Sequence, residues 1–173
     1  MSAVAKLTEL EQSFDRLLAA HGPSLKRLAA AYTNTASDRD DLLQEIAMAL
    51  WQALPKFRGE CSERTFLFRI ATNRAIAYLA RRRTHPVTGE EIEVHDPAPD
   101  PEAGLAQEQR VERLRRAILR LPLLYRQAIT LSLEGLGYSE IAEVLGISES
   151  NVGARLARAR QILRESLEGR HER

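Results

Sequence analysis

Apolar side chains recur at helical spacing on both sides of one proline-rich segment, and this pattern restricts the fold more than any other feature. The segment THPVTGEEIEVHDPAPDPEAGLAQE covers residues 84–108 and carries seven Asp/Glu but no Lys/Arg. Its prolines block regular helix, because proline lacks the backbone donor and clashes with the preceding turn. The sequence therefore predicts two small helical domains, residues 1–83 and 109–173, joined by a flexible acidic linker.

The composition indicates an all-α protein. The 173 residues include only nine aromatic side chains and nine glycines, and Ala, Leu, Arg and Glu dominate as good helix formers do. A single cysteine, Cys61, excludes an internal disulfide, and the four histidines are too scattered to form a local zinc signature with it. We expect no metal, no cofactor and a reducing cytoplasm. No apolar run approaches the roughly 20 residues that cross a bilayer, so we expect no membrane insertion.

The charge is unevenly distributed along the chain. Residues 1–83 carry 13 Lys/Arg against 9 Asp/Glu, and residues 109–173 carry 12 against 8, although the net charge is only +1. Two basic blocks that flank an acidic segment are typical of two units that bind polyanions such as nucleic acid. Solvated charge without a function is the alternative.

The first domain contains a predicted helix, SDRDDLLQEIAMALWQAL, with Asp38 as its expected N-cap. Apolar residues cover most of its circumference, which predicts a largely buried helix. A narrow strip remains for solvent: Asp41, Gln44, Glu45, Met48 and Gln52. An exposed Met among acidic residues suits the surface of a partner, and an ordinary solvated face with one stray Met is the alternative.

The following helix, ERTFLFRIATNRAIAYLARRR, presents a flat and polar face. On a helical wheel that face holds Thr65, Arg69, Thr72, Asn73, Ile76, Ala80 and Arg83. It ends in Arg81, Arg82 and Arg83, which could hold phosphates or could simply complement the dipole of the helix C-terminus. Most aromatic side chains nearby belong to the core. Phe57, in the loop-like PKFRGECS, is the one that we expect at a surface, where it could stack on an unpaired base.

The stretch YSEIAEVLGISESNVGARLARAR, residues 138–160, has the features of a helix-turn-helix. Gly146 ends one short helix and Ser148 caps the next, while Ile147 and Val152 can form a hydrophobic staple. Val152, Leu156, Ala159 and Leu163 are expected to face inward. The outward face holds Glu149, Ser150, Asn151, Ala154, Arg155 and Arg158. This pattern predicts a recognition helix that enters a DNA major groove, although helix-turn-helix units that bind no DNA also occur.

Three segments together resemble the extracytoplasmic-function (ECF) class of bacterial RNA polymerase sigma factors. They are DRDDLLQEIAMALWQAL, FRGECSERTFLFRIATNRAIAYLARRR and LPLLYRQAITLSLEGLGYSEIAEVLGISESNVGARLARARQIL, in the order and spacing of that family. The resemblance implies a sigma-2-like bundle joined to a sigma-4-like helix-turn-helix domain. It also implies a transcription initiation factor that is a dissociable subunit of RNA polymerase and not an enzyme.

The resemblance assigns roles to the residues singled out above. The strip with Asp41, Gln44, Glu45 and Met48 would bind core RNA polymerase. Promoter melting and the downstream promoter element would fall to Phe57, Arg58, Arg69, Asn73, Arg81, Arg82 and Arg83. Upstream promoter DNA would be read by Ser150, Asn151, Ala154, Arg155 and Arg158. The acidic linker would thread the channels of the polymerase, although it could simply avoid DNA. An anti-sigma factor is an expected partner.

Two positions depart from the family pattern, and two other functions are alternatives. Gly153 stands where a basic residue is common, which removes a phosphate contact and weakens the helix by about 1 kcal/mol relative to Ala. Phe66 stands where tryptophan is common. A free-standing helix-turn-helix regulator is the main alternative function, but residues 1–83 resemble neither a dimer interface nor a sensor. A hydrolase is the other, and no paired carboxylates or activated nucleophile support it.

Overall fold

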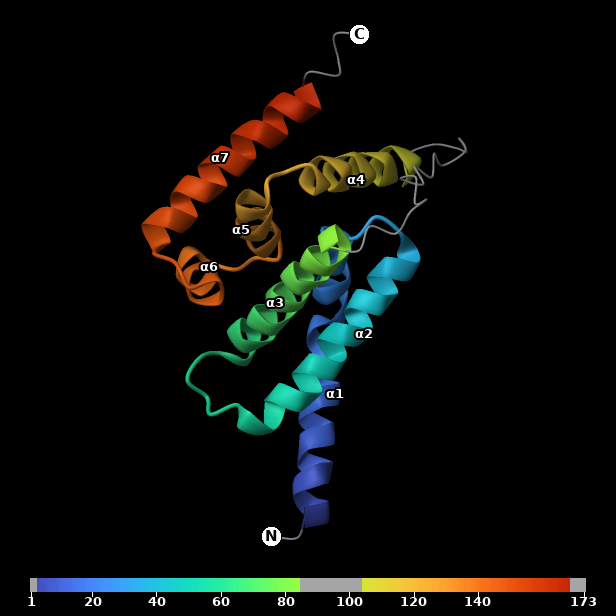
Figure 1. Cartoon of the computed structure of the whole chain (residues 1–173), viewed down its shortest axis with the longest axis vertical. Helices are drawn as coiled ribbons and strands as arrows, with labels where there is room; N and C mark the ends of the chain where they lie inside the picture. Colours follow the sequence, from blue (N-terminus) through green and yellow to red (C-terminus); the bar gives the residue numbers. More distant parts are fainter. Residues whose placement is uncertain (1–2, 85–103, 169–173) are drawn as a thin grey trace.

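The computed structural model describes residues 3–84 and 104–168, and in these ranges the regular structure is helical throughout (Figure 1). The N-terminal half consists of α1 (Ala3–Ala30), α2 (Ala36–Ala53), the short 3-10 helix η1 (Leu54–Lys56) and α3 (Glu63–Thr84). The C-terminal half consists of α4 (Gly104–Leu119), α5 (Leu123–Leu133), α6 (Tyr138–Leu145) and α7 (Glu149–Glu168). The predicted all-α fold is confirmed.

The predicted acidic linker lies mostly outside the described residues. Helix α4 already begins at Gly104, within the stretch 84–108 that we assigned to the linker, because no proline follows Pro101 before the first turn. The division into domains at residues 83 and 109 stays a prediction.

The N-terminal half is a three-helix bundle in which α1, α2 and α3 contact one another. Leu28, Ile46 and Phe68 contribute fully buried side chains from the three helices. Helix α2 begins one turn earlier than expected, because the Thr35 hydroxyl accepts a hydrogen bond from the Asp38 backbone N–H at 3.1 Å. The assignment of Asp38 as the N-cap is therefore wrong. Asp38 lies in the first turn of α2, where its carboxylate is free to pair with another helix.

Ser62 caps helix α3, and the burial of two threonines on this helix differs from the predicted polar face. The Ser62 hydroxyl accepts from the Thr65 backbone N–H at 3.0 Å, and its own proton reaches the Thr65 hydroxyl at 2.9 Å. Thr65 and Thr72 are both buried, at 1% exposure. They do not belong to the exposed face, because neighbouring helices cover them. The Thr65 hydroxyl accepts from Ser62, whereas the buried Thr72 hydroxyl has no hydrogen-bond partner among the described residues. Asn73 is exposed on this helix, as expected.

The C-terminal half packs α4, α5 and α6 around α7. Val152, Leu156, Ala159 and Leu163 are buried, which confirms the predicted inward face of α7. Apolar residues at spacings of 3, 4 and 3 predict a row of Val111, Leu114, Ile118 and Leu121 on one side of α4. The prediction is wrong for Val111, which is 58% exposed, whereas Ile118 and Leu121 are buried.

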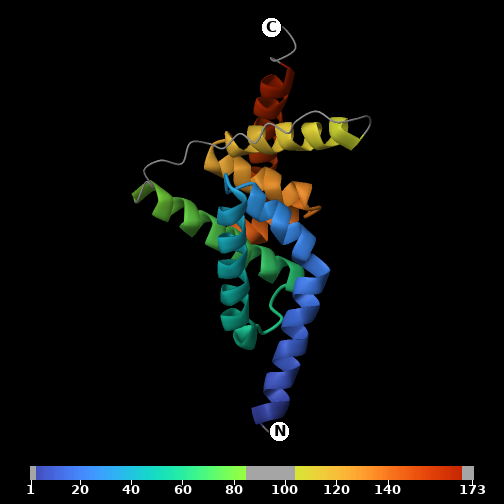
Figure 2. The same cartoon turned by 90° about the vertical axis from the view of Figure 1, so that its right-hand side faces the viewer.

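Helix α1 contains Pro23 within its 28 residues. A proline inside a helix removes one backbone hydrogen bond and clashes with the preceding turn, so the helix bends there. Figure 2 shows α1 changing direction in its middle, with the first part projecting beyond the bundle. The second part of α1 lies beside the C-terminal half of the molecule.

The two halves meet mainly where α3 contacts α6. The molecule is elongated, with the first turns of α1 and the last turns of α7 at opposite ends (Figure 1). Buried apolar side chains from both halves join in one cluster. The helix-turn-helix unit is thus held against the side of the N-terminal bundle.

We predict opposite effects for alanine at two glycines of the helix-turn-helix unit. Gly146 has a φ of 66°, so Gly146→Ala should lower the free energy of unfolding by about 1 kcal/mol because an L side chain is strained there. Gly153 lies in the helix interior, where an added Cβ would meet the Tyr138 ring at an ordinary 3.5 Å. Gly153→Ala should raise the free energy of unfolding by roughly 0.5–1 kcal/mol. Urea denaturation followed by circular dichroism measures both, and the reverse order would contradict this account.

Candidate nucleic-acid interface

The predicted strip on α2 lies at the surface. Met48 is 63% exposed, and Asp41 and Gln44 are exposed beside it. The opposite side of the helix is buried, through Leu42, Ile46, Ala49 and Leu50. Glu45 is only half-buried and forms an ion pair with Arg81 of α3 at 2.6 Å. The strip therefore presents one large apolar side chain among acidic and amide groups on a rigid helix.

The loop between η1 and α3 forms a hollow with one aromatic wall. The rings of Phe57 and Phe66 lie 4.5 Å apart between centroids, at an interplanar angle of 33°. Gly59 has a φ of 72°, a backbone conformation that suits glycine and turns the loop back toward α3. The hollow measures about 550 Å³ and is lined by Lys56, Phe57, Arg58, Glu60, Cys61, Phe66, Arg69 and Glu143. A planar group of the size of a nucleobase fits a hollow with a stacked ring and basic rims.

The three arginines at the end of α3 have different surroundings. Arg82 donates to Tyr78 and pairs with Asp38, and its guanidinium also lies over the Tyr78 ring at 5.5 Å. Arg81 is held by Glu45, whereas Arg83 is exposed. Arg81 and Arg82 thus tie α3 to α2, and Arg83 is the member of the three that is most available to a phosphate.

The Asp38–Arg82 contact sets the charge of both groups. Burial alone would raise the pKa of Asp38, but hydrogen bonds with Arg82, Thr35 and Tyr78 hold it below its ordinary value of 3.8. The hydrogen bond to Tyr78 raises the pKa of Arg82, with further support from Asp38. Both groups are therefore charged near neutral pH, and the pair joins the first turn of α2 to the last turn of α3.

The helix-turn-helix turn has the expected construction. Gly146 adopts the left-handed conformation, and the N–H of Ile147 returns to the carbonyl of Ala142 at 3.1 Å. The Ser148 hydroxyl accepts from the Asn151 backbone N–H at 3.2 Å, so Ser148 is the cap of α7 as predicted. This cap fixes the angle between α6 and α7 and leaves the first turn of α7 free to approach another molecule.

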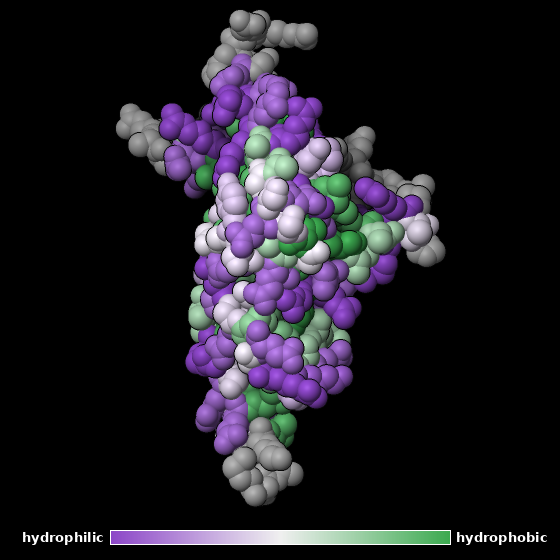
Figure 3. Space-filling view, turned by 90° about the vertical axis from the view of Figure 1, so that its left-hand side faces the viewer, coloured by the Kyte–Doolittle hydropathy of each residue, from purple (hydrophilic) through white to green (hydrophobic). Residues whose placement is uncertain are grey.

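The outward face of α7 is polar along its length. Ser150, Asn151, Ala154 and Arg158 are exposed. Arg155 is half-buried, and its Nε donates to the Asn151 side-chain oxygen at 2.9 Å. This bond holds an arginine and an amide side by side near the helix tip. Such side chains can reach base edges and phosphates in a major groove. Figure 3 shows that the side of the molecule carrying α6 and α7 is largely hydrophilic, with smaller apolar areas among the polar groups.

The sequence did not reveal how the helix-turn-helix unit contacts the N-terminal bundle. Arg27 donates to both carboxylate oxygens of Glu134, at 2.9 and 2.7 Å, and Arg69 donates to the backbone carbonyl of Glu143 at 3.2 Å. The Arg69 guanidinium also lies 3.6 Å from the Glu143 carboxylate. Arg69, predicted as a nucleic-acid contact, is therefore engaged by α6 in this structure. Residues this far apart in sequence leave no local signal of such pairing.

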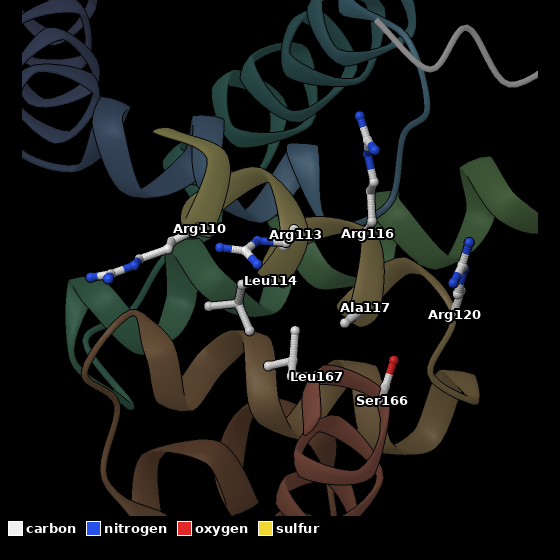
Figure 4. A pocket seen from close by; sticks show the side chains of 8 residues that line it. All are labelled: Arg110, Arg113, Leu114, Arg116, Ala117, Arg120, Ser166 and Leu167. Atoms are coloured by element: carbon white, nitrogen blue, oxygen red, sulfur yellow. The ribbon is translucent and has the colours of Figure 1, made fainter. Parts of the chain in front are cut away.

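A second basic surface lies on α4, away from the predicted sites. A hollow of about 380 Å³ is rimmed by four arginines, with Leu114, Ala117 and Leu167 between them (Figure 4). The rim consists of Arg110, Arg113, Arg116 and Arg120. Arg116 is paired with Glu112 at 2.9 Å, and Arg110, Arg113 and Arg120 are exposed.

Residues 3–84 and 104–168 hold no group of three or more His, Cys, Asp or Glu side chains that could bind a metal ion. Within the same ranges, no helix combines the length and the apolar character that crossing a membrane requires.

The two halves of the chain match two parts of one protein class. Residues 17–85 match the family described as Sigma-70 region 2, and residues 111–163 match Sigma-70, region 4. A chain with these two modules is a sigma factor, a dissociable specificity subunit used in transcription initiation and not itself an enzyme. The chain is also 32% identical over 149 residues to the ECF RNA polymerase sigma factor SigM of Mycobacterium tuberculosis, covering 86% of this chain and 74% of the relative. It therefore belongs to the ECF sigma factors.

Other relatives and solved structures agree with this assignment. The ECF RNA polymerase sigma-E factor of Escherichia coli is 30% identical over 164 residues, covering 88% of this chain and 85% of the relative. The structure of CnrH in complex with the cytosolic domain of CnrY superimposes with a TM-score of 0.70 and 28% identity, covering 92% and 90% of the two chains. The sigma factor RpoE in complex with the anti-sigma factor NepR from Bartonella quintana gives 0.73 at 23% identity, covering 91% and 98%, and shows a shared fold.

We predict that the Asp38–Arg82 pair makes the stability of the chain depend on pH. Asp38→Asn should lower the free energy of unfolding by roughly 1 kcal/mol near pH 7, because it removes the charge that Arg82 faces. A lowered pKa means that this contribution is present above the ordinary pKa of 3.8 and is lost as the pH falls through the lower folded value. The difference between wild type and variant should therefore shrink below about pH 4.

Thermal or urea unfolding at several pH values measures this difference. Asp40 is exposed on the same helix, so Asp40→Asn is the matched control and should change stability much less. A difference between wild type and Asp38→Asn that stays constant down to the lowest accessible pH would contradict the role given to the pair.

Proposed function

We propose that this sigma factor binds core RNA polymerase through α2, melts promoter DNA at the hollow beside α3 and reads upstream promoter DNA with α7. The observation that carries the proposal is the coexistence, in one chain, of a polar strip with an exposed Met48, an aromatic hollow with basic side chains in its lining and a capped recognition helix. A free-standing helix-turn-helix regulator, the alternative function, would need neither the strip nor the hollow, and the family assignment does not favour it.

The polymerase contact is proposed for Asp41, Gln44, Glu45 and Met48. Met48 is the natural centre of such a contact, because burying a large exposed apolar side chain contributes most of the binding energy at a small interface. The acidic and amide groups around it would fix the register against a basic partner. Glu45 already pairs with Arg81, so we assign it a supporting position.

The melting site is proposed for Phe57, Arg58 and Arg69, which line one hollow. Asn73 and Arg83 are proposed as further DNA contacts farther along α3, outside the lining of the hollow. Only an unpaired base, which is present in the open duplex, could stack on Phe57. The site therefore shifts the equilibrium toward opening by its differential affinity and needs no hydrolysis. Because Phe57 rests on Phe66 at 4.5 Å, its ring is supported from behind, and arginines around it can hold the flanking phosphates.

Upstream promoter DNA is proposed to contact Ser150, Asn151, Ala154, Arg155 and Arg158. The small side chains at the tip allow close approach to the groove, and the arginines can reach guanines or phosphates. Gly153 lies beside the Tyr138 ring and supplies no phosphate contact of its own. We infer that affinity for the upstream element depends more on Arg155 and Arg158 than in relatives with a basic residue at that position.

Regulation by a protein partner is part of the proposal. Two solved structures that resemble this chain are complexes, CnrH with the cytosolic domain of CnrY and RpoE with the anti-sigma factor NepR. We infer that an anti-sigma factor restrains this chain too, and that the chain works in the bacterial cytoplasm, where RNA polymerase is found.

The polymerase contact predicts a selective effect at Met48. Met48→Glu should weaken binding to core RNA polymerase by at least about tenfold, because a carboxylate would be buried without a partner in the interface. Stability should change little, since the side chain is 63% exposed. Competition for core polymerase, followed by fluorescence anisotropy of a labelled chain, measures the affinity. The control is Leu124→Glu, which changes a 54% exposed apolar side chain on α5. Equal affinities for both variants would remove Met48 from the interface.

The melting site predicts a dependence on the ring at position 57. Phe57→Ala should reduce open-complex formation by the holoenzyme about 5- to 100-fold, because stacking contributes roughly 1–3 kcal/mol per base. Phe57→Tyr keeps the ring and should restore most of the activity. Permanganate reactivity of promoter thymines and run-off transcription with core polymerase are the measurements. Transcription that requires the chain but is insensitive to Phe57→Ala would place melting elsewhere, and transcription that never requires the chain would refute the proposed function.

A further inference from the structure

Where the N-terminal bundle contacts the C-terminal half, the bundle contributes arginines and the C-terminal half contributes carboxylates. Arginines of the bundle face carboxylates of the C-terminal half in three pairs. These pairs are Arg27–Glu134 at 2.7 Å, Arg64–Glu140 at 3.8 Å and Arg69–Glu143 at 3.6 Å. The surface of the bundle is therefore positively charged here. The negatively charged groups that face it lie on α6 and at the end of α5.

Arg64 is the central member of this contact. Its guanidinium donates to the backbone carbonyl of Glu134 at 2.5 Å, and it lies over the Phe68 ring at 6.0 Å. Gly135, which has a φ of 80°, passes so close that an added Cβ would stand 3.4 Å from this guanidinium. The turn after α5 therefore packs directly against an arginine of the N-terminal half.

Two further arginines belong to the C-terminal half and contact the N-terminal half. Arg115 of α4 donates to the backbone carbonyls of Ala30 and Thr33, at 3.4 and 3.2 Å. Arg126 of α5 lies over the ring of Tyr32 at 5.9 Å, and Tyr32 is itself buried. The contact between the halves thus extends from the end of α1 to the N-terminal part of α3.

The position of Glu143 matters most for function. Glu143 belongs to α6, yet it lines the hollow that contains Phe57, Arg58 and Arg69. Its carboxylate and carbonyl oxygens both face Arg69. A carboxylate beside an arginine offers the charge and hydrogen-bond geometry that a phosphate would offer. The helix-turn-helix unit therefore occupies part of the proposed melting site.

We propose that α6 acts as a built-in inhibitor of the melting site, with Glu143 standing in for a nucleic-acid phosphate against Arg69. In the free chain the two halves close, and single-stranded DNA must displace Glu143 before it reaches the hollow. Any partner that separates the halves exposes the site. The proposal rests on the proposed function, because it takes the hollow to be where unpaired DNA binds.

The energetics suit a reversible restraint. Partly exposed ion pairs are individually weak, and both partners are partly exposed in Arg64–Glu140 and in Arg69–Glu143. In the third pair Arg27 is exposed, but the Glu134 side chain is buried. Packing between the halves also contributes to the closed state, because their buried apolar side chains join in one cluster. A closed state lowers the apparent affinity for DNA by the fraction of open chain, and polymerase binding can overcome it.

The test compares two double variants of the full chain with the same change in charge. Glu140→Gln with Glu143→Gln removes two carboxylates from the interface. Glutamine keeps the capping role of Glu140, whose side chain accepts from the Gly137 N–H at 2.8 Å. The control, Glu165→Gln with Glu168→Gln, removes two exposed carboxylates from the last turns of α7. The probe is a short fluorescent single-stranded DNA of mixed sequence, and small-angle scattering reports the radius of gyration.

The interface variant should bind the oligonucleotide about three- to tenfold more tightly than wild type and should have a larger radius of gyration. The control should match wild type in both. An expanded variant with unchanged affinity would show that α6 does not block the hollow, and no change in either quantity would show that these carboxylates do not close the chain. Either result overturns the proposal.

A third variant separates this proposal from the proposed function. Adding Phe57→Ala to the interface variant should abolish the gain in affinity if the gain arises in the hollow, and a gain that persists would overturn the inhibitor. Failure of the wild-type chain to support transcription by core polymerase would instead refute the proposed function, whatever the outcome of the DNA-binding comparison.

Discussion

Helix α3 packs against the other helices of the N-terminal bundle and against the helix-turn-helix unit at the same time. The arrangement of the molecule depends on these two contacts. One side of the helix is apolar and buried against α1 and α2, through Leu67, Phe68, Ala71 and Ala75. Another side carries Arg64 and Arg69, which contact the helix-turn-helix unit. The same helix also presents Asn73 to solvent. Core packing, contact between the halves and the proposed DNA site are therefore mechanically linked through one rigid element.

Arginine serves structure as well as nucleic-acid binding in this chain. Arg82 joins α3 to α2 through Asp38 and Tyr78, and Arg16 joins α1 to α3 through Glu63 at 2.7 Å. Burial lowers the pKa of Arg126, which lies against Tyr32. A count of basic residues consequently overstates the surface available to phosphates. The exposed arginines, such as Arg58 and Arg158, are the better candidates for DNA contacts.

Local patterns predicted the elements and their caps well. The positions of Gly146, Ser148 and the buried row of α7 followed from turn chemistry and from a period of 3.6 residues, which depend on neighbours in sequence. The exposure of Met48 followed in the same way. Predictions failed where another element decides. Thr65 and Thr72 are polar yet buried by neighbouring helices, and Val111 is apolar yet exposed. One local prediction also failed, because Thr35 and not Asp38 caps α2.

The candidate site shows the same limit. The sequence, with the family resemblance, drew attention to Phe57 and Arg58, which line the hollow, and to Asn73, which is not part of its lining. It contained no sign that Glu143 also lines the hollow. That proximity results from a contact between residues 74 positions apart, Arg69 and Glu143. Pairing of long charged side chains across helices depends on the relative position of whole elements, and no local periodicity encodes it.

The proline within α1 gives the N-terminal bundle a joint. Because Pro23 donates no backbone hydrogen bond, the two parts of α1 are coupled less stiffly than two parts of an uninterrupted helix. The second part carries Arg27 and leads to Tyr32, both of which contact the C-terminal half. The first part packs Phe14 edge-on against Trp51 of α2 at 5.3 Å between ring centroids. A change in the position of the C-terminal half would therefore bend α1 at Pro23, while the contact between Phe14 and Trp51 keeps the first part of α1 packed on α2.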